Sequence, residues 1–221
     1  QDGKYVLTGS NLINGVRVPT QIVVAEGVKA EIILDKLNIE NNDGDAAYCG
    51  EGAVSATQPF IINGDVNMYV KSDSALSSME RSNSNYTLWV TQNGRLSLDT
   101  GKDICLSNKS ILADGYMEMN GGNLKTNRII TGSKGKVIIN NGALEVKGSI
   151  GGLDSGDIII NDGTVLAENI GARSKNVIIN GGDVSVTNSS DDDAAIGSTY
   201  RNECGNITIN GGNIKASANH G

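Results

Sequence analysis

The segment that decides the fold is Ile207-Thr-Ile-Asn-Gly-Gly-Asn-Ile-Lys-Ala216, because it is one of five copies of a single short template. In each copy a short alternating stretch is followed by a turn of Asn-x-Gly type and then by a second alternating stretch. Asn and Gly tolerate the left-handed turn conformation, so each copy is predicted as strand, turn and strand. The other four copies begin at Tyr116, Val137, Ile158 and Val177.

The spacing of the turn asparagines predicts a solenoid. They follow one another at intervals of 20, 21, 19 and 30 residues, at Asn120, Asn140, Asn161, Asn180 and Asn210. A period near 20 is too long for an array of hairpins and suits one turn of a repeat protein. A third aligned element lies between the copies, as Ser149-Ile-Gly-Gly, Asn169-Ile-Gly-Ala and Ala195-Ile-Gly-Ser. We therefore predict an all-β fold, a single-stranded right-handed parallel β-helix with three strands per coil and about 20 residues per turn.

The whole chain is expected to form one domain, residues 1–221. Residues 1–115 follow the same pattern less regularly, whereas residues 116–221 form regular coils, of which the last is incomplete. Aromatic residues make up only 4% of the chain, so Ile, Val, Leu and Ala must fill the core. Tyr5, Tyr69 and Trp89 are predicted as the larger core residues, with sugar stacking as the alternative role.

The alternation assigns residues to the two sides of the wall. Successive side chains of a strand point to opposite faces, so residues at one inward position should stack about 4.8 Å apart. One predicted stack is Val137, Ile158, Val177 and Ile207, and another is Ile150, Ile170 and Ile196. The turn asparagines could form an amide ladder, or they could merely supply the turn conformation.

Composition excludes several classes of function. The net charge of −7 disfavours nucleic-acid binding through phosphate neutralisation, and an acidic ligand would need a bridging cation. No apolar run approaches the length needed for membrane insertion, and no signal peptide remains at the start. The cysteines, Cys49, Cys105 and Cys204, lack zinc-site spacing and are predicted to be buried thiols.

The clearest interruption of the repeat is the 30-residue interval between Asn180 and Asn210, which must hold two loops. Loops on a rigid scaffold are where binding groups collect, so Asn188, Arg201 and Glu203 are candidate ligand-binding residues. The same region is rich in carboxylates, and a similar acidic stretch precedes Ala46. Such oxygens suit Ca²⁺, although a solvated acidic loop is the alternative. The candidate calcium ligands are Asp191, Asp192, Asp193, Asp43 and Asp45.

Two surfaces are candidate protein contacts. Ile138, Ile159 and Ile178 occupy the same outward position in successive coils, so they could form an apolar stripe unless a loop folds over it. The unfinished last coil would leave an open edge that a partner could cover.

The motifs also carry a family resemblance. Asn206-Ile-Thr-Ile-Asn-Gly-Gly-Asn-Ile-Lys-Ala216 and Ala194-Ala-Ile-Gly-Ser198 look like repeats of large bacterial surface proteins. The stretch from Gly3-Lys-Tyr-Val-Leu-Thr-Gly9 through Ala30-Glu-Ile-Ile-Leu to Asp45-Ala-Ala is similar to the opening of a clostridial carbohydrate-binding β-helix family. The resemblance implies a pectate-lyase-like fold, polygalacturonate binding and calcium, and it covers most of the chain. Its motifs describe the fold more than the site.

Three functions follow from these expectations. The leading one is a non-catalytic, secreted or cell-surface binding or adhesion module for an extended polysaccharide, with Ca²⁺ as a candidate cofactor. The alternatives are a structural stalk of a larger surface protein and a polysaccharide lyase or hydrolase. Catalysis is disfavoured because His220 is the sole histidine and Arg128, Arg173 and the lysines look scattered between turns.

Overall fold

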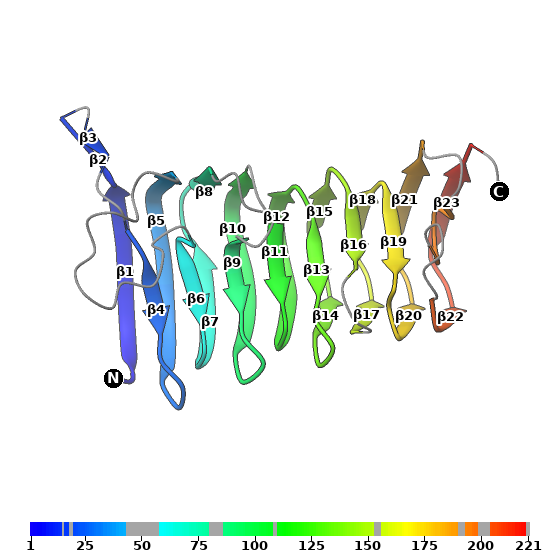
Figure 1. Cartoon of the computed structure of the whole chain (residues 1–221), viewed down its shortest axis with the longest axis horizontal. Helices are drawn as coiled ribbons and strands as arrows, with labels where there is room; N and C mark the ends of the chain where they lie inside the picture. The colour runs from blue at the N-terminus through cyan, green and yellow to red at the C-terminus, as the bar shows by residue number, and fades with distance from the viewer. Residues whose placement is uncertain are drawn as a thin grey trace.

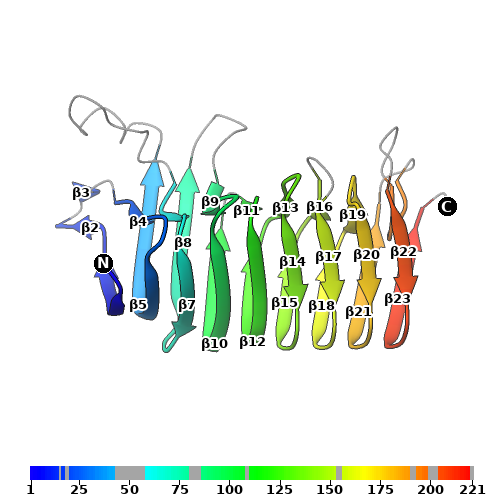
Figure 2. The same ribbon diagram turned by 90° about the horizontal axis from the view of Figure 1, so that it is seen from below.

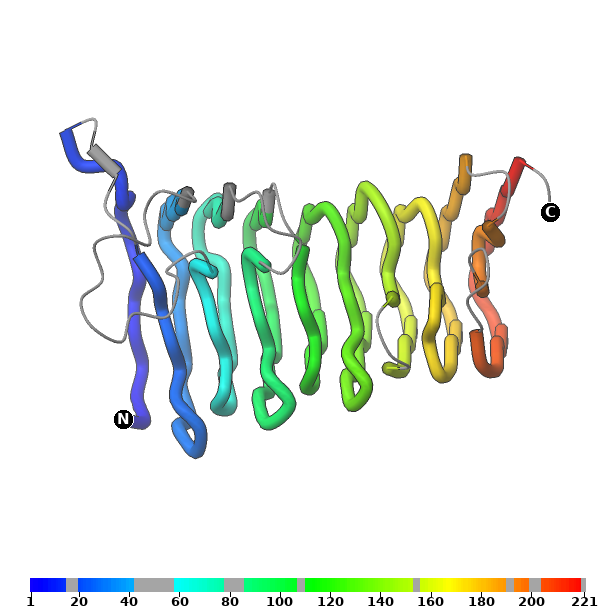
Figure 3. The backbone as a smooth tube through the Cα atoms, in the orientation of Figure 1, coloured from blue at the N-terminus to red at the C-terminus, as the bar shows by residue number. Residues whose placement is uncertain are grey.

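The computed structural model describes residues 1–14, 16–17, 20–42, 58–79, 86–107, 110–152, 156–189, 193–198 and 204–219. Over these residues the protein is all-β and elongated, with its two termini at opposite ends of the long axis (Figures 1 and 3). None of these residues belongs to a helix, so the described part of the chain has no helix that could cross a membrane.

A 14-stranded sheet forms most of the wall, and the pairings determined within it are all parallel. Its strands are β1 (Gly3–Ser10), β5 (Lys29–Asn42), β7 (Asp65–Val70), β8 (Ser74–Met79), β10 (Arg95–Ser107), β12 (Tyr116–Thr126), β14 (Lys136–Ile139), β15 (Ala143–Val146), β17 (Asp157–Ile160), β18 (Thr164–Ala167), β20 (Asn176–Ile179), β21 (Asp183–Asn188), β22 (Asn206–Ile209) and β23 (Asn213–Ala218).

A seven-stranded parallel sheet forms a second wall, and a small hairpin projects near the N-terminal end (Figure 1). The second sheet contains β4 (Ile22–Val24), β6 (Phe60–Ile62), β9 (Tyr86–Val90), β11 (Ser110–Ala113), β13 (Ile129–Thr131), β16 (Ser149–Gly151) and β19 (Asn169–Ala172). The hairpin is antiparallel and consists of β2 (Leu12–Ile13) and β3 (Val16–Arg17).

Each repeat pairs with the next one along the chain, so like residues stack. Val137 pairs with Ile158, which pairs with Val177, and Val177 pairs with Ile207. In the second sheet Ile150 pairs with Ile170, which bridges to Ile196. Both predicted stacks are therefore confirmed. Figure 2, turned by 90°, shows the same succession of strands along the long axis, an arrangement compatible with a parallel β-helix.

The core is aliphatic because alternate strand residues point inward. In β14, Val137 and Ile139 are buried while Lys136 and Ile138 are half-buried on the outer side. Fully buried residues continue through all repeats up to Val184 and Val186. At the C-terminal end, β22 and β23 pair on one side within the described residues, and their inward Ile207 and Ile209 are 45% and 52% exposed. β22 and β23 are therefore the last strands of the sheet that the structure describes.

The aromatic residues differ from expectation. Tyr69 is 42% exposed because its neighbours Met68 and Val70 take the inward positions of β7. Tyr5 pairs with the buried Ile32 and so faces inward, but it lies in the first strand of the sheet and is 40% exposed. Trp89 is half-buried and donates a hydrogen bond from Nε1 to Asp114. Among the described residues, the aromatic Phe60 is fully buried instead.

The thiol prediction was also wrong in part. Cys105 is exposed, and Cys204 is half-buried; both are free. Desolvation raises the pKa of the Cys204 thiol. Cys49 lies outside the described residues.

The turn asparagines form a continuous amide ladder. In each case Nδ2 of one Asn donates to Oδ1 of the Asn in the preceding repeat at 2.7 Å, through the pairs Asn140–Asn120, Asn161–Asn140, Asn180–Asn161 and Asn210–Asn180. Asn120 ends the ladder by donating to Oγ of Ser97 at 2.8 Å. Of the two interpretations of these residues, the ladder is the one that the structure supports.

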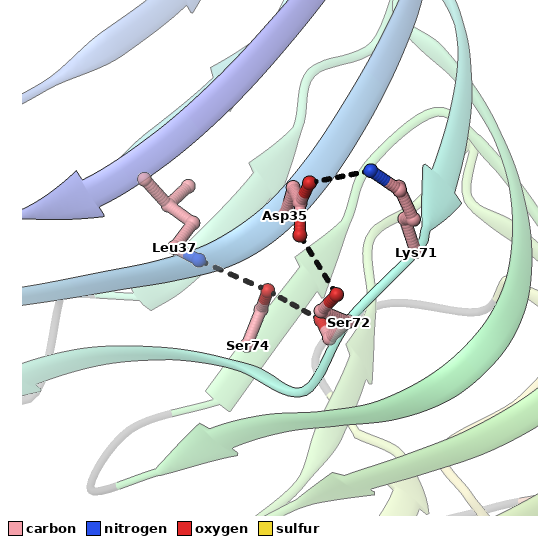
Figure 4. Close-up of polar contacts among 5 residues, drawn as sticks. All are labelled: Asp35, Leu37, Lys71, Ser72 and Ser74. Carbon is pink, nitrogen blue, oxygen red and sulfur yellow. Dashed lines mark hydrogen bonds and ion pairs between the residues drawn. The ribbon is translucent and has the colours of Figure 1, made fainter.

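A polar network fixes the corner of the long strand β5 (Figure 4). Lys36 has a φ of 56°, so the strand bends between Asp35 and Leu37. Lys71 Nζ lies 2.7 Å from one Asp35 carboxylate oxygen, and Ser72 Oγ donates to the other at 2.7 Å. Ser74 Oγ accepts from the Leu37 amide at 3.2 Å. The bonds from Lys71 and Ser72 lower the pKa of Asp35 below its ordinary value.

Candidate binding groove

A groove of about 700 Å³ lies where the two sheets meet, beside β16 and β19. It crosses several repeats, since the residues that line it are far apart in the sequence. Its lining consists of links that precede the second sheet, residues of β16 and β19, the turns that follow them, and the start of the long loop region: Asn127, Arg128, Lys147, Gly148, Ser149, Gly152, Glu168, Asn169, Ala172, Arg173, Asn188 and Asp193.

The links that enter the second sheet are stacked by backbone hydrogen bonds. The Gly148 amide donates to the Asn127 carbonyl at 2.8 Å, and the Glu168 amide donates to the Gly148 carbonyl at 2.9 Å. The next repeat follows, because the Ile170 amide donates to the Ala195 carbonyl at 3.0 Å. Four charged residues from these successive repeats line the groove: Arg128, Lys147, Glu168 and Asp193.

Arg128 is held in a defined direction. Its Nε and Nη2 donate to Oγ of Ser149 in the next repeat at 3.3 and 3.2 Å. Its aliphatic stem crosses Gly148, where a Cβ atom would lie 3.2 Å from Cγ of Arg128. Neither Arg128 nor Lys147 forms an ion pair within the described residues, and both side chains are exposed. Their charges are therefore available to a ligand in the groove.

Two buried asparagines hold the backbone at Ala194 beside the groove through hydrogen bonds. Asn169 donates from Nδ2 to the Ala194 carbonyl at 2.6 Å and accepts from the Ala172 amide at 3.1 Å. Asn188 donates to the same Ala194 carbonyl at 3.1 Å, and both side chains are 3% exposed. Asn188, a candidate ligand-binding residue, thus lines the groove as a side chain that fixes the loop backbone.

The other predicted site residues are only partly described. Asp193 lines the groove and is half-buried. Within the described residues, no group of three or more His, Cys, Asp and Glu side chains could hold a metal ion. The remaining candidates lie outside the described residues: Asp43, Asp45, Asp191, Asp192, Arg201 and Glu203.

Sequence reasoning missed the basic side chains of the groove. Arg128, Lys147 and Arg173 were expected to be scattered, but the structure brings all three to one groove. The signal was available, since each lies within three residues of an isoleucine of the Ile129, Ile150 and Ile170 stack. Aligning the repeats on these isoleucines would have grouped them.

A smaller hollow of about 170 Å³ adjoins the groove and shares Asn127 and Lys147 with it. It extends the lined surface to Cys105 and Leu106, and its rim carries the Lys125–Glu145 ion pair at 3.0 Å. The combined surface therefore spans the repeats from β10 to the loop after β21.

The isoleucine stripe is a separate feature of the outer wall. Ile138, Ile159 and Ile178 are aligned as predicted, and all three are half-buried. Glu118 precedes the stripe and Thr208 follows it. Although desolvation raises it, the pKa of Glu118 is lowered overall by hydrogen bonds from Tyr116 and Ser97 and by the charge of Arg95. The stripe is thus bordered by polar groups and is only three repeats long.

Comparisons with known proteins do not assign the groove. No protein-family model, curated protein or solved structure matches the chain. The functional interpretation therefore depends on the geometry and chemistry of the groove itself.

Proposed function

We propose that the chain is a single right-handed parallel β-helix domain with three strands per coil that serves as a non-catalytic, secreted or cell-surface binding module for an extended polysaccharide. The observation that carries this proposal is the groove across successive repeats, lined by charged and amide side chains. The likeness of its opening motifs to a carbohydrate-binding β-helix family supports the same function.

The groove suits a polymer because of its direction. Repeats stacked as parallel strands follow one another at about 4.8 Å, so equivalent side chains recur along the long axis. An extended glycan that lies along this axis would meet a new set of polar groups at each repeat, and its affinity would be the sum of modest contacts. Arg128 and Lys147 can contact acidic substituents directly, so an acidic glycan would need no bridging cation at that point.

The test is a binding titration of the full chain against acidic and neutral polysaccharides. The double variant Arg128→Gln, Lys147→Gln should weaken binding of acidic oligosaccharides roughly tenfold or more, because two charge-assisted contacts are lost. Lys215→Gln on the outer wall, outside the groove, is the matched control and should bind normally. A chain that binds none of the polysaccharides would refute the proposal and favour a structural stalk.

We also propose that the module binds Ca²⁺, and this part of the proposal is supported by the sequence alone. In the sequence, Asp191 and Asp192 directly precede Asp193, which lines the groove, and Asp43 and Asp45 form a second acidic stretch. Carboxylate oxygens at this density suit a cation that takes six to eight oxygen ligands. Calorimetry with Ca²⁺ would show heat of binding that Asp192→Asn weakens; absence of uptake at millimolar concentration would remove calcium from the account.

A lyase is the second candidate, and one observation favours it. Such an enzyme needs basic side chains close to carboxylates, and the groove contains both kinds. Incubation with pectate and measurement of the absorbance of unsaturated products distinguishes the two functions, and we expect no product.

A further inference from the structure

Ser149 is a buried residue of the groove whose hydroxyl oxygen already accepts two hydrogen bonds. It lines the groove at the start of β16 and is 7% exposed. Arg128 donates to Ser149 Oγ from Nε at 3.3 Å and from Nη2 at 3.2 Å. A serine hydroxyl has two lone pairs and one proton. With both lone pairs engaged, Ser149 can act toward a ligand only as a hydrogen-bond donor.

The hydroxyl proton of Ser149 has no acceptor among the residues that the structure describes. Asn169 pairs with Ser149 in the next repeat but uses its side chain elsewhere. Its Nδ2 donates to the Ala194 carbonyl, and its Oδ1 accepts from the Ala172 amide. Because a buried donor without an acceptor is costly, an oxygen atom supplied by a ligand in the groove would be bound favourably.

Two cationic side chains accompany this hydroxyl in the groove. The guanidinium group of Arg128 polarises the Ser149 hydroxyl, because hydrogen bonds in a chain strengthen one another. Arg128 uses two of its N–H groups on Ser149, and its other N–H groups have no acceptor within the described part of the chain. Lys147 is exposed and can only donate. These three side chains therefore offer a ligand hydrogen-bond donors and no acceptor.

We infer that Ser149, Arg128 and Lys147 form an oxyanion subsite of the groove, in which Ser149 is a specificity-determining donor. The oxyanion is the carboxylate or sulfate ester of an acidic sugar, because its oxygen atoms accept hydrogen bonds and donate none. A neutral sugar hydroxyl also has a proton to donate, and these three side chains provide no acceptor for it. The inference rests on the proposed polysaccharide function and names the chemical group that the groove recognises.

The experiment is a double-mutant cycle, because Ser149 also holds Arg128 in place and the two effects must be separated. Titration calorimetry would compare the full chain with Ser149→Ala, Arg128→Ala and the double variant. The ligands are a galacturonate hexamer, a sulfated galactan hexamer and the fully methyl-esterified galacturonate hexamer, which carries no oxyanion. Ser185→Ala is the matched control, since this serine lies in β21 and outside the groove.

We expect Ser149→Ala to weaken the tighter-binding acidic hexamer about tenfold, the effect of one hydrogen bond to a charged group. In the Arg128→Ala background the same change should still weaken it about fivefold, because the hydroxyl remains a donor but is no longer polarised. Ser149→Ala should not weaken the methyl-esterified hexamer, and Ser185→Ala should bind all three ligands normally. Whichever acidic hexamer binds more tightly identifies the oxyanion as carboxylate or sulfate.

Two results would overturn the inference. If the effect of Ser149→Ala disappears in the Arg128→Ala background, Ser149 only positions the guanidinium group. If Ser149→Ala weakens the methyl-esterified hexamer as much as the acidic ones, the hydroxyl does not recognise an oxyanion. Both results leave polysaccharide binding in place. If none of the hexamers binds, the inference and the proposed function fail together.

Discussion

The turn asparagines stabilise the stack of repeats through a chain of hydrogen bonds. Each inner asparagine donates one side-chain N–H to the preceding repeat and accepts one bond at its side-chain oxygen from the next repeat. The donor always belongs to the later repeat and the acceptor to the earlier one. The amides therefore point the same way, and hydrogen bonds in such chains strengthen one another. Exposure to water limits the gain in folding free energy, because each of these hydrogen bonds replaces hydrogen bonds to solvent.

The ladder predicts a graded loss of stability at its centre. Asn161→Ala removes the bonds to Asn140 and from Asn180 and should lower the free energy of unfolding by about 1–2 kcal/mol. Asn161→Asp can still accept from Asn180 and should lose about half as much. Urea unfolding measures both, with Lys215→Ala as the control outside the ladder. Loss no greater than that of the control would show that the asparagines serve only the turn.

Among the elements, the long strands differ most from expectation. Tyr116–Lys125 was predicted as two strands around a turn, but β12 runs from Tyr116 to Thr126 without a break. Gly122 has a φ of 74°, so the chain bends within the strand, and the pairing of β12 with β10 shifts register at this bend. In β5 the bend lies at Lys36, which has a positive φ although it is not glycine. The hydrogen-bonded network of Asp35, Lys71 and Ser72 lies beside this bend (Figure 4).

The corner of β5 predicts a dependence on pH. The pKa of Asp35 is lowered from its ordinary value of 3.8, so its stabilising effect is complete above that value and is lost as the pH falls through the folded pKa. Asp35→Asn should therefore be less stable than the wild type at about pH 6, and the difference should shrink below about pH 3. Urea unfolding at both pH values measures it; a difference that persists unchanged at low pH would contradict this origin.

At the scale of the whole molecule, the fold was predictable because each repeat carries its own strand and turn signals. The stacks of Ile and Val followed from alternation alone, whereas Tyr69 was misplaced because one residue of strand register exchanges the two faces. The sequence could not decide whether the turn asparagines form an amide ladder, because the ladder depends on how their side chains align between repeats. The handedness remains a prediction.

The site was less predictable than the fold for a physical reason. Arg128 and Arg173 are distant in the sequence and meet in one groove through the stacking of intervening repeats. Sequence reasoning looked for function in the loops that break the repeat, and of those residues Asn188 and Asp193 do line the groove. The basic residues belong to the regular repeats, which had been assigned to the scaffold.

The most direct test of the account is the affinity of the full chain for acidic oligosaccharides of increasing length, measured by calorimetry. A groove that crosses successive repeats predicts affinity that rises with each added sugar unit and levels off once the groove is filled, with Arg128→Gln, Lys147→Gln weakening the longer oligosaccharides most. Affinity that is independent of length, or that the double variant leaves unchanged, would contradict a polysaccharide bound along the groove.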